Sequence, residues 1–432
     1  MKVAIVGTGI SGLTVAHRAH PHHELTLFEA GASPGGHTAT VDVEVDGRSW
    51  AVDTGFIVFN SKTYPNFLAL LEELGVEWLD TTMGFSVKSE KNGLEYNGTT
   101  VNSLFAQRSN IFRPRFWRMV KDILRFYREA RELLAPGNEH VKLGPYLREK
   151  GYSKQFVEEH LNPMGAAVWS ASAETMEQFP AAFFLRFFEN HGFLEVNERP
   201  TWRVVKGGSR EYMRKMIRPF EDRIRVNTPV TGLRRDADGV ELFFGRGESE
   251  RFDEVVLACH APQALEILGS EASEDERQVL SLFKTQPNKV ALHTDMSLLP
   301  KRPLARAAWN VRLPKDDSEL VRVTYWMNDL MRLPSDAPSF LVTLNEDDTI
   351  DDSKVLRRFV YSHPIFTPEA IQAQSRHAEI SGADRVHFCG AYWRNGFHED
   401  GHVSGLTVAN ALLPEREHVI PRPIHKAIPV TG

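Results

Sequence analysis

The sequence predicts an α/β fold in which a parallel-sheet domain, built from three separate stretches of chain, is interleaved with an α+β domain. An apolar, β-branched strand runs into a G-x-G-x-x-G turn at Gly7, Gly9 and Gly12. A second strand–glycine–helix pattern follows at 387–413, and a helical, aromatic segment at 83–195 lies between them. The 432 residues exceed what one hydrophobic core usually organises, so two domains are expected.

Composition excludes several classes of protein. The net charge of −6 argues against a nucleic-acid binder, whose surface is basic. Cys259 and Cys389 are the only cysteines, too few for a disulfide framework. A strand that starts at residue 2 leaves no room for a signal peptide, and no 18 apolar residues run together. A cytoplasmic protein is therefore expected, and no metal site is predicted.

Hydrophobic periodicity and turn residues divide the chain into elements. The predicted strands and helices are strand 2–6, helix 10–20, strand 24–29, helix 66–74, a helix from Pro114 to 134, strands at 223–235, 240–244, 252–258 and 290–294, and a final helix at 403–413. Residues 1–82, 196–284 and 366–413 are expected to form the parallel-sheet domain. Residues 83–195 and 285–365 are expected to form the second domain, and 414–432 a C-terminal tail.

The first glycine motif predicts a phosphate site. Gly7 permits a tight turn, Gly9 lets the backbone approach a pyrophosphate, and Gly12 lets the helix pack on the strand. Ser11 lies in the first turn of the helix, whose N–H groups and positive dipole end favour an anion. Glu29 ends the second strand 17 residues after Gly12, where a carboxylate can bind both ribose hydroxyls or remain an exposed loop side chain.

A second turn follows the carboxylate at Gly35-Gly36-His37-Thr38. Paired glycines at this point are not needed for NAD and are expected for a longer dinucleotide. The residues resemble the flavin amine oxidase superfamily, in which a glutamate is followed by Gly-Gly-Arg and then Thr or Ser. His37 stands where the arginine usually lies, so pyrophosphate binding would depend more on backbone amides and the helix end.

The resemblance extends through the chain. Thr54-Gly55 resembles the stretch that passes the isoalloxazine ring, Val230 the strand that contacts the adenine, and Gly390 the start of the C-terminal flavin segment. It implies FAD as cofactor and a Rossmann-like FAD-binding domain interleaved with an α+β substrate domain, the amine oxidase (GR2-type) topology. Both cysteines look like packing residues, so the FAD is expected to be noncovalent.

The final helix is predicted to lie beneath the flavin. A helix N-terminus stabilises the negative charge of reduced flavin. Gly401 would allow close approach of the ring, and Val403 belongs to the same segment. Asp400 either lies beside the cofactor or caps the helix.

A closer resemblance appears in the stretches 52–60, 202–203, 207–209 and 396–401. They look like FAD-dependent oxidoreductases that are fused to, or encoded beside, cyclopropane-fatty-acyl-phospholipid synthases. This implies chemistry on a lipid acyl substrate, such as desaturation of a modified fatty acyl chain, and a functional link to such a methyltransferase.

Catalytic candidates follow from the same resemblance. Lys289 lies in a stretch similar to the superfamily strand whose lysine holds a water against flavin N5, although it also fits a surface strand. His398 and Glu399 precede the final helix and would supply a proton acceptor. Hydride would leave an aliphatic substrate for N5, and proton loss would leave a double bond.

Two features bear on the substrate and its location. Aromatic residues between 105 and 193 would line an apolar tunnel or form an ordinary core. Arg118, Lys121, Arg125 and Arg128 form a basic stripe on one helix, which either is solvated or docks on anionic lipid headgroups, at about 1 kcal/mol per charge. The stripe predicts peripheral contact with the inner face of the membrane.

Two alternatives stay open. An amine oxidase would release an imine and hydrogen peroxide, but no pair of tyrosines that could grip an amine is evident. A redox-neutral isomerase, or a subunit in which the flavin is structural, would also retain the cofactor site.

Overall fold

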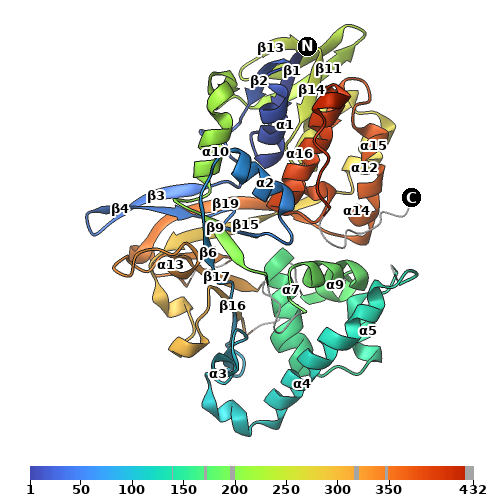
Figure 1. The fold of residues 1–432 in the computed structure, drawn as a ribbon. Helices are drawn as coiled ribbons and strands as arrows, with labels where there is room; N and C mark the ends of the chain where they lie inside the picture. The colour runs from blue at the N-terminus through green and yellow to red at the C-terminus, as the bar shows by residue number, and fades with distance from the viewer. Residues whose placement is uncertain (139, 170–172, 195–199, 316–320, 346–348, 424–432) are drawn as a thin grey trace.

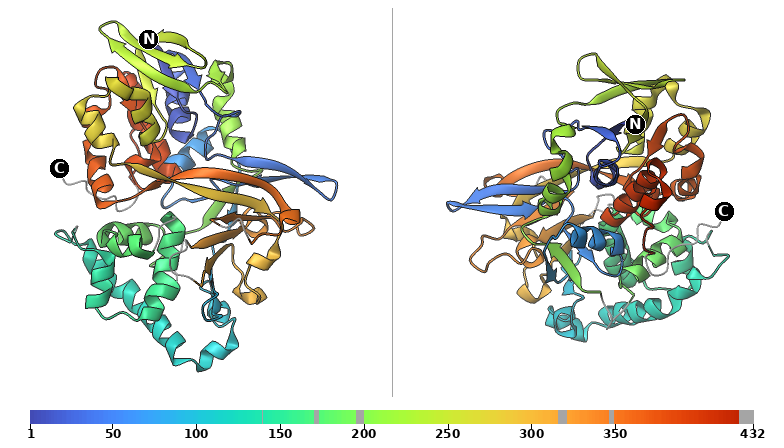
Figure 2. Two further views of the ribbon diagram at one scale, coloured as in Figure 1. Left: turned by 180° about the vertical axis from the view of Figure 1, so that it is seen from behind. Right: turned by 45° about the horizontal axis from the view of Figure 1, so that its top comes forward.

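The computed structural model describes residues 1–432 except 139, 170–172, 195–199, 316–320, 346–348 and 424–432. Figure 1 shows three regions along the long axis: a sheet covered by helices near the N-terminus, a layer of long strands in the middle, and a group of helices at the far end. The same arrangement is seen from behind in Figure 2.

A five-stranded parallel sheet forms the first region. Its order is β10 (Ile224–Arg225), β2 (Glu24–Phe28), β1 (Lys2–Val6), β14 (Glu254–Leu257) and β20 (Val386–Phe388). Strands β1 and β14 are almost wholly buried, as expected for a sheet covered on both faces. Strand β1 lies between β2, which follows it along the chain, and β14, which comes from a much later stretch; such sheets bind ligands where the strand order reverses in this way.

Helices α1 (Ile10–Ala19) and α16 (His398–Leu412) lie side by side against this sheet (Figure 1). The predicted strand–helix–strand unit at the N-terminus is confirmed by β1, α1 and β2 within one residue. Helix α2 (Pro65–Glu73) also matches, with Gly75 at φ +60° after its end. The last helix begins five residues before the predicted Val403, because Asp400 accepts a hydrogen bond from the Phe397 N–H group.

The middle layer is a seven-stranded mixed sheet and its neighbours. The sheet order is β19 (Val355–Ile365), β15 (Lys284–His293), β18 (Leu341–Leu344), β17 (Arg322–Trp326), β16 (Trp309–Leu313), β7 (Phe85–Ser89) and β8 (Glu95–Asn97). Two smaller sheets adjoin it: β3 (Thr40–Val45) with β4 (Arg48–Asp53), and β5 (Val58–Asn60) with β9 (Trp202–Val205) and β6 (Trp78–Thr81). A third, β11 (Val230–Asp236) with β12 (Gly239–Phe244) and β13 (Glu248–Phe252), lies beside the parallel sheet near the N-terminus (Figure 1).

The far region is helical. It contains α3 (Val101–Leu104), α4 (Pro114–Glu129), α5 (Leu143–Glu149), α6 (Lys154–Phe156), α7 (Asn162–Trp169), α8 (Ala173–Gln178) and α9 (Ala181–Asn190). Helix α4 begins at the predicted proline. One hydrophobic core joins these helices to β7 and β16, so the helices rest on the mixed sheet. The remaining helices are α10 (Arg210–Ile217), α11 (Ala261–Leu268), α12 (Glu274–Leu280), α13 (Met327–Leu330), α14 (Pro368–Ala373) and α15 (His377–Ile380).

The three stretches assigned to the parallel-sheet domain do meet in one sheet, which contains β1, β14 and β20. The predicted boundary at 195–196 lies outside the described residues, and the division into domains stays a prediction. Part of the predicted tail packs on the fold: the Asn66 side chain accepts a hydrogen bond from the Arg422 N–H group at 2.6 Å and donates one to the Arg422 carbonyl at 2.9 Å.

Candidate active site

A cavity of about 730 Å³ lies at the carboxyl end of β1 and continues between the mixed sheet and the helical region. Every block of the chain contributes to its wall, from the Gly7 turn to His398. Its two halves differ in character: one half lies at the Gly7 turn, and the other is apolar and aromatic.

The glycine turn forms one end of the cavity. Gly7 has φ +102°, and an added Cβ would lie 2.9 Å from the Ala258 carbonyl oxygen. A Cβ at Gly12 would lie 2.1 Å from the Gly7 carbonyl oxygen, so α1 can approach the turn only without a side chain there. An added Cβ at Gly9 would meet no atom within 4 Å. Gly9 and Ser11 therefore present an open helix N-terminus to the cavity.

Glu29 lines the cavity beside this turn. Its carboxylate accepts hydrogen bonds from the Gly31 N–H group at 2.7 Å and from the Thr8 N–H and hydroxyl groups. Val230 lines the same end, and Thr228 donates its N–H to the Glu29 carbonyl. The residues predicted to hold the adenosine part of a dinucleotide thus lie together.

Helix α11 adds residues that sequence reasoning missed. Gln263, Glu266 and Ile267 line the cavity near Val230. A signal was present in the sequence, because α11 follows β14 in the same way that α1 follows β1. Both helices therefore begin at the carboxyl edge of the parallel sheet, where ligands bind.

The second glycine turn packs directly on the first. Gly36 has φ +56°, and an added Cβ would lie 3.1 Å from the Gly9 Cα atom. Gly35 has φ +124° and donates its N–H to the Thr8 carbonyl oxygen, and Thr38 donates to the Gly35 carbonyl oxygen. This geometry brings His37 into the cavity beside the N-terminus of α1.

Three imidazoles gather at this point. The ring centroid of His37 lies 5.4 Å from that of His363 and 6.3 Å from that of His260. Burial, and the charges of the nearby His363 and His260, lower the pKa of His37 to about 3. Burial lowers the pKa of His363 to about 4, and it lowers the pKa of His260 below its usual value. His37 Nε2 is buried without a hydrogen-bond partner, so it is available to a ligand.

The tautomer of His363 follows from its neighbour. The Asn288 amide nitrogen donates to the Gln286 carbonyl at 3.1 Å and to His363 Nδ1 at 2.9 Å. Because the Gln286 carbonyl can only accept, the amide orientation is fixed and His363 Nδ1 is the acceptor. The ring proton therefore lies on Nε2, where it can be donated.

The Thr54–Gly55 segment passes between this cluster and the rest of the cavity. An added Cβ at Gly55 would lie 2.2 Å from the His37 carbonyl oxygen, and Phe56 donates its N–H to that oxygen at 2.7 Å. The Thr54 and Tyr361 hydroxyls lie 2.8 Å apart. The Gly35–Thr38 turn and the Thr54–Gly55 segment, both predicted to contact the cofactor, are therefore joined to each other.

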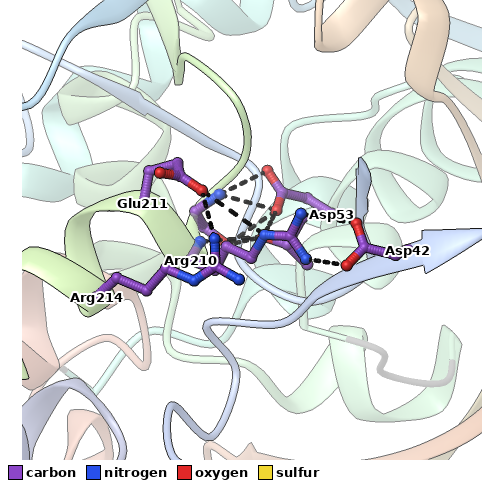
Figure 3. A network of polar contacts seen from close by, with 7 residues as sticks. Asp42, Asp53, Arg210, Glu211 and Arg214 are labelled. Atoms are coloured by element: carbon purple, nitrogen blue, oxygen red, sulfur yellow. Dashed lines mark hydrogen bonds and ion pairs between the residues drawn. The ribbon is translucent and has the colours of Figure 1, made fainter. Parts of the chain in front are cut away.

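A polar network behind this segment holds it in place (Figure 3). Asp53 is fully buried and accepts hydrogen bonds from the Ser209 N–H and hydroxyl groups and from the Thr40 hydroxyl. Burial raises the pKa of Asp53 to about 6. Arg210 binds both carboxylate oxygens of Asp42, at 2.5 and 2.7 Å. The network ties the β3–β4 hairpin to α10, as Figure 3 shows.

His398 lines the cavity and is held on two sides. Its ring stacks on Phe56, with the centroids 3.8 Å apart. Its Nε2 atom lies 2.6 Å from the Tyr212 hydroxyl, which in turn lies 2.5 Å from the Thr38 hydroxyl. Burial lowers the pKa of His398 well below its usual value, so the imidazole is neutral and fixed in orientation.

Glu399 and Asp400 lie outside the main cavity, beside a small neighbouring one. Glu399 accepts hydrogen bonds from the Asn66 and Phe67 N–H groups, at 3.0 and 2.8 Å, at the N-terminus of α2. Asp400 caps its own helix, which was one of the two predicted roles, and lies 3.4 Å from the Arg394 guanidinium. Burial raises the pKa of Glu399 to about 7 and that of Asp400 to about 6.

The final helix differs from the prediction at Gly401. An added Cβ there would lie 2.7 Å from Ile10 Cγ2, so the missing side chain makes room for α1 rather than for a ligand. Val403 is buried and, like Gly401, does not line the cavity. Gly390 does line it. The α1–α16 contact therefore supports the site from behind.

The predicted placement of Lys289 is wrong. Lys289 is exposed on β15, whereas its neighbours Asn288 and Val290 are buried and Val290 lines the cavity. Because side chains alternate along a strand, the ammonium group lies on the opposite face of the sheet.

The second half of the cavity is apolar and aromatic. Its wall includes Trp169, Phe187, Phe193, Trp309, Val342 and Leu344. Among the described residues that line the whole cavity, only Glu29 and Glu266 have charged side chains, and both belong to the first half. Of the aromatic residues between 105 and 193, Trp169, Phe187 and Phe193 line the cavity, whereas most of the others form an ordinary core: Phe105, Phe116, Phe183, Phe184 and Phe188. Tyrosines that the sequence did not reveal as a pair, Tyr325 and Tyr361, also line the cavity.

The first half fits FAD. A diphosphate needs N–H donors, which the open α1 N-terminus supplies at Gly9, and the buried, unpartnered Nε2 of His37 offers another contact. Glu29 lies where a ribose would be bound. In the described part of the chain, no group of three His, Cys, Asp or Glu side chains is arranged to hold a metal ion.

Comparison with known proteins agrees with this geometry. The model of the family described as flavin-containing amine oxidoreductase matches residues 10–360. The chain belongs to this family. The protein is accordingly an FAD-dependent oxidoreductase, with the interleaved α/β fold expected from its sequence. It has no match among curated protein sequences.

Solved structures share the fold of this chain at low identity. Cyclohexylamine oxidase from Brevibacterium oxydans IH-35A superposes with a TM-score of 0.69 at 15% identity, over 95% of this chain and 98% of that one. A fatty acid isomerase from P. acnes, described as producing CLA, has a TM-score of 0.65 at 16% identity, with the same coverage. Putrescine oxidase with bound putrescine has a TM-score of 0.63 at 15% identity, over 95% and 99%.

No helix among the described residues has both the length and the apolar character that a membrane span requires.

Proposed function

We propose that this protein oxidises an aliphatic substrate, such as a modified fatty acyl chain, and leaves a double bond. The bound FAD would supply the hydride acceptor at N5. The apolar second half of the cavity carries the proposal, because its described wall offers aromatic and aliphatic contact and no charged side chain.

Individual residues would divide the work. Trp169, Phe187 and Trp309 would pack along the chain and exclude water. His398 is neutral and fixed by Tyr212, so it can accept a proton from a substrate carbon brought next to it. Glu399 would act indirectly, because it caps α2 and does not line the main cavity. Lys289 has no proposed role.

The FAD would be bound by the first half of the cavity. Gly9 and Ser11 would present N–H groups to the diphosphate. Glu29 would accept hydrogen bonds from the ribose, and Val230 would contact the adenine. Thr54 and Gly55 would pass along the isoalloxazine ring. No cysteine attachment is proposed, because Cys389 is buried and burial raises the pKa of the Cys259 thiol to about 12.

Anaerobic titration tests the substrate class. Purified holoenzyme is mixed with phospholipids that carry saturated, methyl-branched or cyclopropane acyl chains, and the flavin absorbance is followed. Bleaching by one acyl class, with an unsaturated product detected by mass spectrometry, is the expected result. Ala167→Leu, which narrows the apolar half, should raise the KM for long chains and leave FAD content unchanged.

An amine oxidase is the second candidate, favoured by Tyr325 and Tyr361 in the cavity wall and by the amine oxidases among the structural neighbours. Bleaching by amines together with peroxide release, and none by lipids, would select it. A third candidate is a redox-neutral isomerase, as the neighbouring fatty acid isomerase illustrates. Conversion of an unsaturated acyl chain without net bleaching would select that.

The proposed acyl substrate also links the enzyme to a cyclopropane-fatty-acid synthase-like methyltransferase, which would make the modified chain. Lipid analysis of cells with and without each of the two genes tests this link. Loss of the methyltransferase should remove the substrate, so the product of the oxidoreductase should disappear as well.

A further inference from the structure

One end of the molecule exposes large hydrophobic side chains. In the described chain these belong to α3, to α4, and to the short helices η1 (Arg108–Phe112) and η7 (Pro303–Ala305). They are Val101, Ile111, Phe112, Trp117, Leu124 and Leu304, and Phe112 is 85% exposed. Helix α3 packs against η7, and η1 against α4, so these elements form one surface, here termed the tip.

The tip projects from the fold. Figure 1 shows α3 and α4 at the end of the molecule opposite to the N-terminus, and the left view of Figure 2 shows the same from behind. The aromatic rings are held in place: Trp117 donates its Nε1–H to the Ile111 carbonyl at 2.8 Å, and its ring lies 5.2 Å from that of Phe105. Folding therefore positions these apolar groups in solvent.

Basic side chains surround the apolar ones. Residues 108–131 contain eight Lys or Arg against two Asp or Glu, in a chain with a net charge of −6. On α4, Trp117, Lys121, Leu124 and Arg128 recur at spacings of three or four residues, so one exposed face alternates apolar and basic groups. Arg113, Arg115 and Arg118 are exposed nearby.

The structure removes one residue, Arg125, from the basic stripe expected from the sequence. Arg125 is turned toward the protein, where its Nε lies 2.7 Å from Glu129, its Nη2 donates to the Lys150 carbonyl, and its guanidinium lies over the Tyr152 ring. Asp122 is buried and accepts a hydrogen bond from the Ser153 N–H group, so its carboxylate is not part of the exposed face of α4.

We propose that the tip docks on the surface of an anionic lipid bilayer, with Phe112 and Trp117 entering the interface and the surrounding Arg and Lys side chains binding lipid phosphates. Aromatic residues prefer the headgroup region, and basic residues are attracted to its negative potential. Charge complementarity favours a bilayer over a symmetric dimer formed through this surface, since two basic tips would repel each other. This docking does not depend on the identity of the substrate.

Vesicle co-sedimentation tests the proposal with full-length holoenzyme. Vesicles of phosphatidylglycerol and phosphatidylcholine (about 1:1) should retain the protein at about 0.1 M salt, and phosphatidylcholine alone should not. Raising the salt concentration to about 0.5 M screens the attraction between the basic side chains and the lipid phosphates, so binding should weaken. Phe112→Ser should lower the partition coefficient about tenfold, and Arg118→Glu with Lys121→Glu should abolish selectivity for the anionic lipid.

Matched controls make the result specific to the tip. Val360 and Ile420 are exposed hydrophobic residues outside the tip, so Val360→Ser and Ile420→Ser should bind vesicles as the wild type does. Retained yellow absorbance verifies that each variant is folded. Equal binding of Phe112→Ser and wild type, or no binding to anionic vesicles at all, overturns the proposal. The proposal is also overturned if Phe112→Ser converts a dimer to a monomer and leaves vesicle binding unchanged.

Discussion

The Glu399 carboxylate accepts hydrogen bonds from both the backbone N–H and the side-chain amide of Asn66, at 3.0 and 2.6 Å. The start of α16 thereby caps the start of α2, and the same Asn66 side chain binds the Arg422 backbone. Asn66 is thus joined to the buried Glu399 carboxylate and to the Arg422 backbone, both of which lie more than 300 residues after it.

The Glu399 contact predicts a pH-dependent stability difference. The pKa of Glu399 is raised to about 7 in the folded protein, so between the unfolded value of 4.5 and about 7 the folded state binds more protons than the unfolded state. The wild type should therefore lose stability relative to Glu399→Gln as the pH rises from about 5 to 7. Urea unfolding at several pH values measures this difference. Exposed Glu44→Gln should show no such trend, and a parallel course for wild type and Glu399→Gln would contradict the prediction.

The imidazole cluster predicts that FAD binding takes up a proton. His37 and His363 are neutral in the protein without a ligand, because burial lowers the pKa of each to about 3 and about 4. A diphosphate placed beside them raises both pKa values, so affinity should fall as the pH rises from about 4, the pKa of His363 without ligand, through the raised values. Other ionisable groups that line the cavity in the described part of the chain are Glu29, Glu266, Cys259, His191, His260, His398, Tyr64, Tyr325, Tyr361 and Tyr392.

Quenching of FAD fluorescence by apoprotein measures this affinity, and calorimetry in buffers of different ionisation enthalpy measures the proton. His37→Arg keeps its charge throughout this range, so its affinity should depend less on pH. His22→Gln, an exposed histidine far from the cavity, is the control. A wild-type affinity that is independent of pH, with no proton uptake, would refute the prediction.

The α1–α16 contact predicts that small substitutions weaken the cofactor site from a distance. An added Cβ at Gly405 would lie 2.5 Å from the Ser11 carbonyl oxygen, whereas one at Gly401 meets the Ile10 side chain, which can shift. Gly405→Ala should therefore cost about 1–3 kcal/mol of stability and more than Gly401→Ala. Both should lower FAD affinity because Ile10 and Ser11 begin α1. Thermal unfolding and FAD titration check this, with exposed Thr407→Ala as control.

The position of Lys289 predicts a neutral substitution. Its side chain lies on the outer face of β15, so Lys289→Met should leave the flavin spectrum, FAD affinity and the rate of reoxidation of photoreduced flavin by oxygen within about twofold of wild type. Val290→Lys, which directs an amine into the cavity, should change these properties. A loss of an order of magnitude in the reoxidation rate of Lys289→Met would restore the lysine as a catalytic candidate.

The sequence predicted the local parts of the site well. The turn at Gly7–Gly12 and the carboxylate at Glu29 follow from short-range geometry, since a strand, a tight turn and a helix fix their positions. The start of α4 at Pro114 and the end of α2 before Gly75 were predictable for the same reason.

What the sequence could not reveal depends on long-range packing. His37, His260 and His363 belong to three distant segments, and no spacing along the chain connects them. Tyr212 reaches His398 across 186 residues. Lys289 was misplaced because a shift of one residue on a strand reverses the face, and the sequence leaves that register open.

The architecture of the parallel sheet has a consequence for how the protein is made. Strand β1 is translated first, but β14 and β20, which complete the sheet beside it, come from residues 254–257 and 386–388. A growing polypeptide on the ribosome therefore cannot enclose its cofactor until the segment through residue 388 has been made, and the glycine turn after β1 stays in an incomplete fold until then.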